Sequence, residues 1–508
     1  MSTLPRVIVT GGSGFLGRRL VGSLLSRARV VGIDRRPRAE AYVPDHENMS
    51  WFQIDLGDAA AVEETFAEIR AGGRVDYFIH LAAYYDFTGE EDPEYERTNV
   101  VGLRNVLDVC RTLGLRRFVF ASSAGAVRVR RDRAPLDEDA PADGEHIYAR
   151  TKRIGEELVR ERSRDFPTVN VRLAALFSDW CEFPPLYFMM ETWLSNAWNA
   201  RVLGGRGETS TPYLHVRDAV SFFLRLLERM DGLERAVTLL ASADGAVSHR
   251  ELYEAATAYA RVGTRPPILV PAFLAGPGIA LNDLVGRMRG QRPFERTWMA
   301  RYIDTFLWVD ASRTRRILGW EPHPRLGLLS RVPYMVENKR SDRVEWVRRN
   351  AEALEHHLVR PNYAVFRIVR RHAAEIAAAH AARFQGPGAD PALARYSGMK
   401  PEEREYHSGL LLRNLMDAVR TGTKGGFMAF CRNLAEHRHR EGYQVENLVA
   451  SLQALRRASV EIVGRDPEAA PFRQAIHDYL AMTIEFGIDQ VLEVFEEHET
   501  GTLPDPEK

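Results

Sequence analysis

A tyrosine and a lysine lie four residues apart in "HIYARTKRIGEELV", residues 146–159, at Tyr148 and Lys152. The stretch has the periodicity of a helix opening, and side chains at that spacing share one helix face. A phenol beside an ammonium can serve as a catalytic base whose pKa the cation lowers. The same spacing also arises by chance on solvated helix surfaces, so the segments that position this pair must decide between the two interpretations.

A glycine-rich turn stands near the start of the chain, in "RVIVTGGSGFLGRRL". Gly11, Gly14 and Gly17 follow an apolar run typical of a strand and open an amphipathic run typical of a helix. Glycine there permits a tight turn, a close backbone approach to a pyrophosphate and close helix packing. The next apolar run, "VVGID", ends in Asp34, the usual place for a carboxylate that binds an adenosine ribose. The pattern favours a dinucleotide-binding turn over a decorative one.

The residues after this strand bear on which dinucleotide binds. The charge of Asp34 would repel a 2′-phosphate and favours NAD, whereas Arg35 and Arg36 could accommodate one, so NADP stays the second choice. "IDLGD" offers Asp55 near the adenine. "IHLAA" offers a strand end where the cofactor could lie close, although a lone histidine there is more often structural; its residues are His80, Ala82 and Ala83.

Short apolar runs alternate with longer amphipathic stretches from residue 6 to about residue 173. Such alternation predicts a doubly wound parallel sheet of the Rossmann type, with helices on both faces. The alternation loosens up to about residue 333, where short elements predict a small α+β substrate lobe over the strand ends. The predicted domains are residues 1–335, with a core of about 1–175 and a lobe of about 176–335, and an all-α domain of residues 336–508.

These motifs, taken in order, resemble the extended short-chain dehydrogenase/reductase family. That family includes nucleotide-sugar epimerases and dehydratases and the 3β-hydroxysteroid dehydrogenases. The resemblance covers about residues 6–325 and rests on "TGGSGFLG", Asp34, "DLGD", "HLAA", "NVVGLRNVLDVC", "FVFASSAGAV", "YARTK", "YLHVRDA" and "DASRTRRILGWEP".

The resemblance implies a catalytic serine at the end of the fifth strand, followed by a Tyr-x-x-x-Lys base. Ser123 is the expected catalytic serine, with Ser122 as the alternative, and Asn99 matches an asparagine that braces the site. Hydride transfer on a secondary alcohol or ketone would follow, with Tyr148 as base and Lys152 anchoring the nicotinamide ribose. The expected cofactor-binding residues are Gly11, Gly14, Phe15, Leu16, Gly17, Asp34, Arg35, Asp55, Leu56, His80, Ala82, Ala83, Asn99, Tyr148 and Lys152.

The chain departs from the family in two places. Ala124 and Gly125 stand where dehydratases place an acidic pair, so a sugar 4,6-dehydratase is not expected. Thr211 and Pro212 occupy the region where an arginine clamps a sugar diphosphate, although Arg206 or Arg217 could substitute. An apolar sterol-, terpenoid- or polyketide-like alcohol is favoured if some lobe aromatics line the pocket rather than the core; these are Trp180, Phe183, Tyr187, Phe188, Trp193 and Trp198. Cys181 is expected to be an ordinary buried thiol.

The last third is nearly continuous in helical periodicity. Helices are predicted near residues 342–359, 363–384, 402–420, 426–441, 444–463 and 471–497. The region loosely resembles the helical sensory domains of bacterial stress-response co-antagonists and is expected to serve dimerisation or a protein partner. His437 and His439 lie two residues apart and do not share a helix face, so no metal site is expected.

The bulk composition indicates a cytoplasmic, globular chain without a nucleic-acid partner. Net charge is zero and the three cysteines are far apart, without metal or disulfide spacing. The first residues lack a signal peptide, and the apolar stretch from Pro266 is broken by prolines and glycines, so no integral membrane segment is expected. The main hypothesis is an NAD(P)-dependent oxidoreductase. Its alternatives are an NAD-retaining nucleotide-sugar epimerase and a regulatory protein that senses NAD(H) and signals through the helical domain.

Overall fold

The computed structural model describes residues 4–87, 89, 91–260, 265–288, 294–354, 361–384 and 391–499. The chain forms two compact units. An α/β unit comprises Met1–Val285 and Pro293–His357, and a helical unit comprises Gly286–Arg292 and Leu358–Lys508. This division falls later than the boundary predicted at residues 335 and 336. The reason is that helix α11 (Leu328–Ser341) packs on α8 (His249–Ala260) and α12 (Arg343–Leu354) packs on α6 (Pro184–Trp193), all within the α/β unit.

A seven-stranded sheet forms the centre of the α/β unit, in the order β11-β6-β5-β4-β1-β2-β3. Every neighbouring pair is parallel, which confirms the predicted doubly wound sheet. The central strands are apolar on both faces because helices cover both. The strands are β1 (Arg6–Thr10), β2 (Arg29–Asp34), β3 (Met49–Gln53), β4 (Tyr77–His80), β5 (Arg117–Ser123), β6 (Thr168–Leu173) and β11 (Ala236–Ala241).

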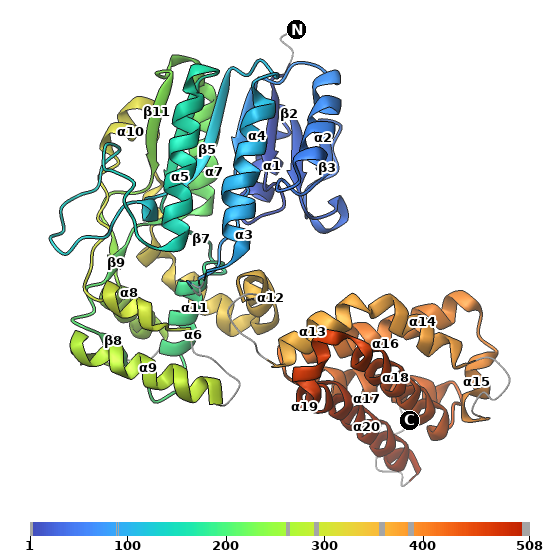
Figure 1. The fold of residues 1–508 in the computed structure, drawn as a ribbon. Helices are drawn as coiled ribbons and strands as arrows, with labels where there is room; N and C mark the ends of the chain where they lie inside the picture. Colours follow the sequence, from blue (N-terminus) through green and yellow to red (C-terminus); the bar gives the residue numbers. More distant parts are fainter. Residues whose placement is uncertain are drawn as a thin grey trace. The chain divides into compact units, whose positions relative to one another are not determined.

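Two helical layers enclose this sheet (Figure 1). Helices α1 (Gly17–Leu24) and α7 (Val216–Arg229) pack on one face, where their leucines and phenylalanines meet Val7 and Val9 of β1. Helices α2 (Ala59–Ala71), α4 (Gly102–Cys110) and α5 (Ile147–Glu161) pack on the other face against Ile8 and Phe118. Helix α3 (Pro93–Glu96) and the π-helical turn η2 (Arg97–Val101) lead into α4.

Small sheets and helices form the lobe beyond the strand ends. Strand β7 (Ala175–Phe177) pairs with β10 (Tyr213–His215), β8 (Val202–Gly204) with β13 (Ile268–Val270), and β9 (Ser210–Thr211) with β12 (Val247–Ser248). The lobe also contains α9 (Ala272–Met288) and η6 (Thr297–Tyr302), whereas α10 (Ser312–Leu318) packs beside α7 and β11 of the sheet. Within the ranges given above, no helix has the length and apolar character needed to cross a membrane.

The helical unit follows the predicted pattern except at two interruptions, one of which is the π-helical turn Ile476–Ala481 inside the helix predicted over residues 471–497. The helix expected over residues 363–384 is two helices that meet at His372, whose ring binds the carboxylates of Asp466 and Glu375. The helices are α13 (Pro361–Arg371), α14 (Ala373–Ala382), α15 (Ala394–Ser397), α16 (Pro401–Thr421), α17 (Gly425–Arg440), α18 (Val445–Arg465), α19 (Arg473–Ala475) and α20 (Met482–Glu499).

Candidate active site

Helix α5 carries the Tyr148 and Lys152 pair to the carboxyl end of strand β5. The helix starts at a histidine cap, because Nδ1 of His146 accepts a hydrogen bond from the backbone N–H of Tyr148 at 3.3 Å. This cap fixes the first turn, and with it the position of the phenol. Four residues later, Lys152 lies on the same face of α5 and points back to β5. The pair therefore faces the sheet and is not a solvated helix surface.

The end of β5 separates the two candidate serines. Ser122 is buried and donates a hydrogen bond to Oε1 of Glu156 at 2.6 Å, on the sheet face opposite to Ser123. Oγ of Ser123 accepts a hydrogen bond from the backbone N–H of Gly125 at 3.1 Å, and its side chain is also hydrogen-bonded to Tyr148. Because Ser122 is already bonded to the buried Glu156 while Ser123 contacts Tyr148 directly, Ser123 is the serine placed to share a substrate oxygen with Tyr148.

The Lys152 ammonium is held in a dry environment. Its side chain is buried, and Nζ donates a hydrogen bond to the carbonyl oxygen of Ala121 at 2.7 Å. Nζ also lies 4.9 Å from the ring centroid of Phe120 and 5.5 Å from that of Tyr148. Burial lowers the pKa of Lys152 to about 8, and the neighbouring Glu156 carboxylate opposes that shift. The ammonium of Lys152 therefore lies above the face of the Tyr148 ring.

The electrostatics of Tyr148 differ from the expectation that Lys152 lowers its pKa. Burial raises the pKa of Tyr148 above its ordinary value, and the hydrogen bond from Ser123 opposes this shift without cancelling it. Desolvation dominates because an isolated phenolate loses its hydration in this pocket. Tyr148 therefore keeps its proton in this state, and a further positive charge is needed before it can act as a base.

The glycine-rich turn packs against the ends of β2 and β4. Gly11 has a φ of 70°, and a Cβ built there would lie 2.7 Å from the backbone nitrogen of Ala82. A Cβ on Gly17 would lie 2.0 Å from the carbonyl oxygen of Gly11. The backbone N–H of Ser13 in this turn donates to Oδ2 of Asp34 at 2.9 Å. A turn that excludes side chains, a helix start and a carboxylate at the strand end together fit the pyrophosphate and ribose of a dinucleotide.

The residues around Asp55, which is expected near the adenine, form an ion-pair network. Oδ2 of Asp55 lies 2.6 Å from Arg97, which also binds Glu94 at 2.8 Å. Glu94 in turn binds Arg35 at 3.1 Å. Leu56 is buried beneath this network, close to the start of α4.

Two expected cofactor residues instead brace the surrounding strands and loops. His80 is buried, its Nδ1 lies 2.9 Å from Oγ1 of Thr10, and burial lowers its pKa to about 3, so the ring is neutral. Asn99 exchanges hydrogen bonds with the backbone of Tyr84 at 2.7 and 2.9 Å and donates to Thr151 at 3.2 Å. Both side chains satisfy their hydrogen bonds within the protein, so they shape the site through their neighbours.

The family follows from the same part of the chain. Residues 7–238 match the sequence pattern of the NAD dependent epimerase/dehydratase family. The match runs from strand β1 into strand β11. Among curated relatives, UDP-glucose 4-epimerase 2 of Oryza sativa subsp. japonica is 31% identical over 185 residues, 34% of this chain and 44% of the relative. A 3 beta-hydroxysteroid dehydrogenase/Delta 5-->4-isomerase of Mycobacterium tuberculosis is 33% identical over 31% of this chain and 42% of its own length.

A sterol-4-alpha-carboxylate 3-dehydrogenase of Saccharomyces cerevisiae is 28% identical over 35% of this chain and 52% of its own length. The chain thus spans about half the length of the curated relatives it matches. The structure of a UDP-glucose 4-epimerase of Thermus thermophilus in complex with NAD superposes with a TM-score of 0.50 and 22% identity, covering 66% of this chain and 99% of the other. That likeness extends the shared fold through the lobe.

The epimerase/dehydratase part of the chain places a wall of aromatic rings beside Tyr148. The Tyr85 ring centroid lies 4.1 Å from that of Tyr148 and 4.1 Å from that of Phe87. Phe87 contacts Phe183 at 5.4 Å, and Phe183 contacts Tyr213 at 6.0 Å. Phe183 is among the aromatics named from the sequence, whereas Tyr85 and Phe87 are not. The signal was the aromatic run "YYDF" directly after "HLAA".

The other lobe aromatics named from the sequence divide between core and surface. Tyr187 and Trp193 are buried, whereas Trp198 is exposed. Phe188 stacks on Phe294 with ring centroids 4.4 Å apart, and Trp180 lies under the Arg349 guanidinium at 5.0 Å. Phe183 joins the aromatic wall directly, through Phe87 and Tyr213.

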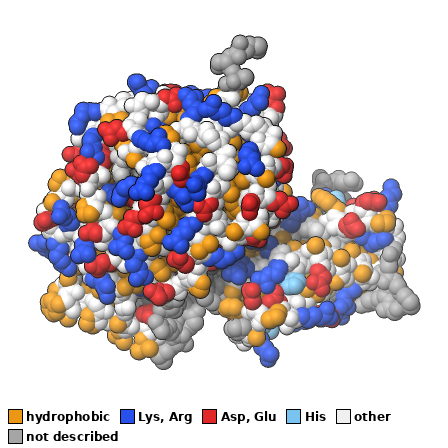
Figure 2. Space-filling model, turned by 45° about the horizontal axis from the view of Figure 1, so that its top comes forward, with side chains coloured by type: hydrophobic (Ala, Val, Ile, Leu, Met, Phe, Trp, Pro, Cys, Tyr) orange, Lys and Arg blue, Asp and Glu red, His pale blue; other side chains and the backbone are white. Residues whose placement is uncertain are grey.

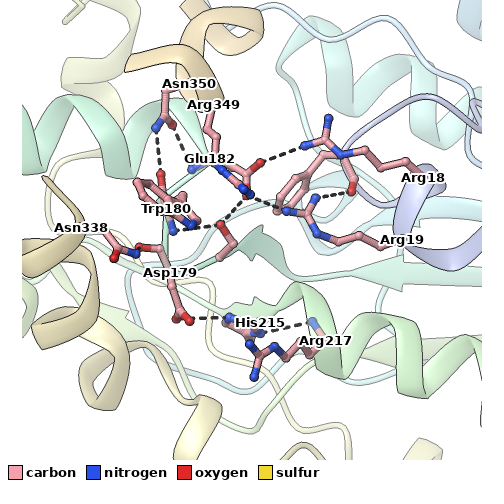
Figure 3. A network of polar contacts seen from close by, with 12 residues as sticks. Arg18, Arg19, Asp179, Trp180, Glu182, His215, Arg217, Asn338, Arg349 and Asn350 are labelled. Atoms are coloured by element: carbon pink, nitrogen blue, oxygen red, sulfur yellow. Dashed lines mark hydrogen bonds and ion pairs between the residues drawn. The ribbon is translucent and has the colours of Figure 1, made fainter. Parts of the chain in front are cut away.

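A buried carboxylate ties the cofactor helix to the lobe (Figure 3). Glu182 accepts hydrogen bonds from Arg18 at 2.9 Å and Arg19 at 2.8 Å, both in the first turn of α1. Its backbone N–H donates to Asn350 of α12 at 2.9 Å. Glu182 and Cys181 both have positive φ angles, of 47° and 75°, which non-glycine residues adopt only under constraint. This loop therefore positions Phe183 in the aromatic wall and α1 under the glycine-rich turn.

Asp179 lies in the same loop, between β7 and α6. Burial opposes its ionisation, yet hydrogen bonds from His215 and Arg331 outweigh it and lower the pKa of Asp179. Burial raises the pKa of the Cys181 thiol, which supports the prediction that it takes no part in acid–base chemistry. Within the described ranges, no cluster of three or more His, Cys, Asp or Glu side chains could hold a metal ion.

Proposed function

We propose that the α/β unit is an NAD-dependent oxidoreductase that transfers hydride to or from the carbon of an apolar secondary alcohol or ketone. The observation that carries this proposal is the convergence of Ser123, Tyr148 and Lys152 beside the glycine-rich turn, with the Tyr85 ring against Tyr148. The regulatory alternative loses ground because a sensor needs no buried lysine above a tyrosine ring.

Each of the three side chains has a distinct part in this proposal. NAD would supply the hydride acceptor and a positive charge at the nicotinamide. Tyr148 takes the proton from the substrate hydroxyl during oxidation and returns it during reduction. Ser123 donates a hydrogen bond to the substrate oxygen as negative charge develops on it. Lys152, one helix turn from Tyr148, stabilises the phenolate against the burial that raises its pKa.

The proposed preference for NAD over NADP rests on two acidic side chains. Asp34 lies within hydrogen-bond distance of the turn at Ser13, where its charge would repel a 2′-phosphate. Arg35 is the cation that could attract such a phosphate, and it is engaged with Glu94 at 3.1 Å. Binding of NADP would have to break this pair.

The proposed apolar substrate rests on the aromatic wall and on the missing diphosphate clamp. Tyr85, Phe87 and Phe183 offer ring faces rather than hydrogen-bond donors next to Tyr148. Arg206, one of the two possible substitutes for the clamp, is engaged with Glu208 and Asp304. A nucleotide-sugar epimerase stays the second candidate, because one curated relative carries that name.

Turnover of the Tyr148→Phe variant tests the proposal. NADH formation is measured with a panel of sterol-like and terpenoid-like secondary alcohols, identified first by mass spectrometry of molecules that co-purify. The variant should lose about 10³-fold in turnover, as expected for loss of a general base, and should keep its affinity for NAD. Tyr259→Phe, on the exposed face of α8, is the matched control and should keep wild-type activity.

The same assay separates the two candidate enzymes. An epimerase would retain its cofactor through purification and give no net change in nicotinamide absorbance during turnover. Wild-type activity in Tyr148→Phe would contradict both candidates.

A further inference from the structure

Strand β13 and helix α9 expose an unusually apolar surface on the lobe. Phe273 is 77% exposed and Leu281 is 64% exposed. Figure 2 shows hydrophobic side chains along the lower edge of the larger part of the molecule. Folded proteins rarely leave such side chains together in water unless they contact a partner or a membrane. The residues of this surface, called the α9 face below, are Ile268, Leu269, Phe273, Leu274, Leu281 and Leu284.

The lobe holds α9 along one side only. Ala275 and Asp283 of the helix are buried, and the backbone of Gly276 lies close to Ala300. Strand β13 pairs in parallel with β8, and Arg201 next to β8 donates a hydrogen bond to the carbonyl oxygen of Pro266 at 2.8 Å. Because one side is anchored, the helix lies along the protein surface and turns the α9 face outward.

The charged residues nearest in sequence to either end of the α9 face are basic. Arg261 and Arg265 precede it and Arg287, Arg289 and Arg292 follow it, whereas Asp283 lies within it and Glu254 and Glu295 stand further out along the chain. Asp283 is buried, so its charge does not oppose an approaching anion at the surface. An apolar helix face flanked by basic residues has the two attractions that hold an interfacial helix on anionic lipids.

A large aromatic side chain extends the same surface. Trp198 is 83% exposed and lies in the turn before β8, three residues ahead of Arg201. Tryptophan is enriched at the level of lipid headgroups, since one end of its ring is apolar and the other can donate a hydrogen bond. Its position beside the β8–β13 pair fits contact with the headgroup region.

From these observations we infer that the α9 face docks on the surface of an anionic phospholipid membrane. The docked segment leads directly to the active site. After it, Phe294 stacks on Phe188, and the Trp298 ring of η6 lies 4.5 Å from the ring of His146, the cap of the helix that carries Tyr148. Docking therefore brings the aromatic surroundings of Tyr148 to the bilayer, where an apolar substrate would be dissolved.

The test measures vesicle binding of the full chain without substrate or cofactor, so its outcome is independent of the proposed reaction. Co-sedimentation uses vesicles of phosphatidylcholine alone and vesicles that also contain phosphatidylglycerol. The wild type should bind the anionic vesicles and be released by high salt. The double variant Phe273→Glu, Leu281→Glu should bind at least ten-fold more weakly.

The matched control is Tyr406→Glu in α16, whose side chain is exposed to nearly the same degree as Leu281, at 65%. It should bind vesicles as the wild type does. Leu281→Ser, a milder change, should show an intermediate loss and guards against misfolding of the double variant. Equal binding by wild type and double variant, or no vesicle binding by the wild type, would overturn the inference. A wild-type dimer that the double variant converts to a monomer, without vesicle binding, would assign the α9 face to a second copy of the chain instead.

Discussion

Each of the two units buries a cluster of titratable side chains: Tyr148 and Lys152 in the α/β unit, and His380 and His407 in the helical unit. The two clusters differ in how their hydrogen bonds are satisfied. In the helical unit, His380 is fully buried and both ring nitrogens are occupied, Nδ1 by Oγ of Ser408 at 2.9 Å and Nε2 by the carbonyl oxygen of Ser451 at 3.0 Å. In the α/β unit, the ammonium of Lys152 has three donors, and within the described residues it makes one hydrogen bond, to Ala121.

The difference separates a structural cluster from a functional one. Burial lowers the pKa of His380 to about 4 and that of Lys152 to about 8, so desolvation acts on both. His380 meets this desolvation in its neutral form with both ring nitrogens hydrogen-bonded, as is usual for buried polar groups in a core. The lysine stays buried with a single hydrogen bond to the protein, an arrangement that costs free energy and is typical of functional sites. The predictions below alter one cluster at a time.

Replacing the lysine should have the largest effect. Lys152→Met should lower turnover about 10³-fold, because Tyr148 loses the cation that favours its phenolate. The same variant should be more stable than the wild type by about 2 kcal/mol, because it no longer buries an ammonium. Unfolding by urea, followed by tryptophan fluorescence, measures this; all eight tryptophans lie in the α/β unit.

The stability gain of Lys152→Met has a defined pH window. The folded-state pKa of about 8 lies below the ordinary value of 10.5, so the unfolded chain binds more protons between these values. Wild-type stability should therefore rise as pH increases from about 8 to 10.5, and the advantage of the variant should be complete below pH 8 and vanish above 10.5. An advantage that is the same at every pH would show that the lysine is not destabilised by burial.

The two adjacent serines of β5 give the next largest effect. Ser123→Ala should lower turnover about 10²-fold with little change in stability, because it removes a donor to the substrate oxygen. Ser122→Ala should cost about 1–2 kcal/mol of stability with little change in turnover, because the buried Glu156 loses a hydrogen bond of 2.6 Å. Activity assays and urea unfolding of the two variants check both; exchanged phenotypes would reverse the assignment.

Acid should weaken the histidine cluster of the helical unit. Burial lowers the pKa values of His380 and His407 to about 4 and about 3, below the ordinary 6.5, and Arg383 and Arg438 contribute in the same direction. Stability from the neutral rings is complete above pH 6.5 and is lost as pH falls toward 4, by about 3 kcal/mol for His380 alone.

Tryptophan fluorescence follows unfolding of the α/β unit alone, since residues 358–508 contain no tryptophan, whereas circular dichroism also follows the helices of the helical unit. Thermal unfolding at about pH 5, between the folded and unfolded pKa values of His380, should lose the circular dichroism of the helices at a lower temperature than at neutral pH. His407→Phe should reduce the shift with pH, whereas the control His437→Ala, an exposed residue on α17, should leave it unchanged. An equal shift in wild type and His407→Phe would argue against a destabilising charge on this cluster.

Much of the fold and part of the site were predictable from local sequence. The strand–turn–helix pattern requires glycine at positions 11 and 17, where a side chain would collide with backbone, so those positions mark the turn directly. Strand alternation also separates Ser122 from Ser123, but their roles depend on the contacts of Ser122 with Glu156 and of Ser123 with Tyr148, which the strand alone does not give.

Contacts between segments distant in the chain could not be predicted in this way. His380 and His407 meet through Ser451, 71 and 44 residues further along the chain, and no local pattern encodes that meeting. The break between α13 and α14 at His372 likewise depends on Asp466, which lies directly after α18. The raised pKa of Tyr148 was missed because desolvation depends on surrounding packing rather than on the spacing to Lys152.

The smallest expected effect compares one tyrosine ring from each cluster. Tyr85 is partly exposed, with its ring 4.1 Å from Tyr148, whereas Tyr396 is fully buried and stacks 5.0 Å from His407. Tyr85→Leu should raise KM for the apolar substrate about five- to ten-fold and leave kcat and stability nearly unchanged, because it removes a ring face that contacts substrate equally before and during reaction. Tyr396→Leu should lower the stability of the helical unit and leave KM unchanged. A fall in kcat for Tyr85→Leu would mean instead that the Tyr85 ring orients Tyr148. The tyrosine ring of the α/β unit would then have a positioning role despite its partial exposure.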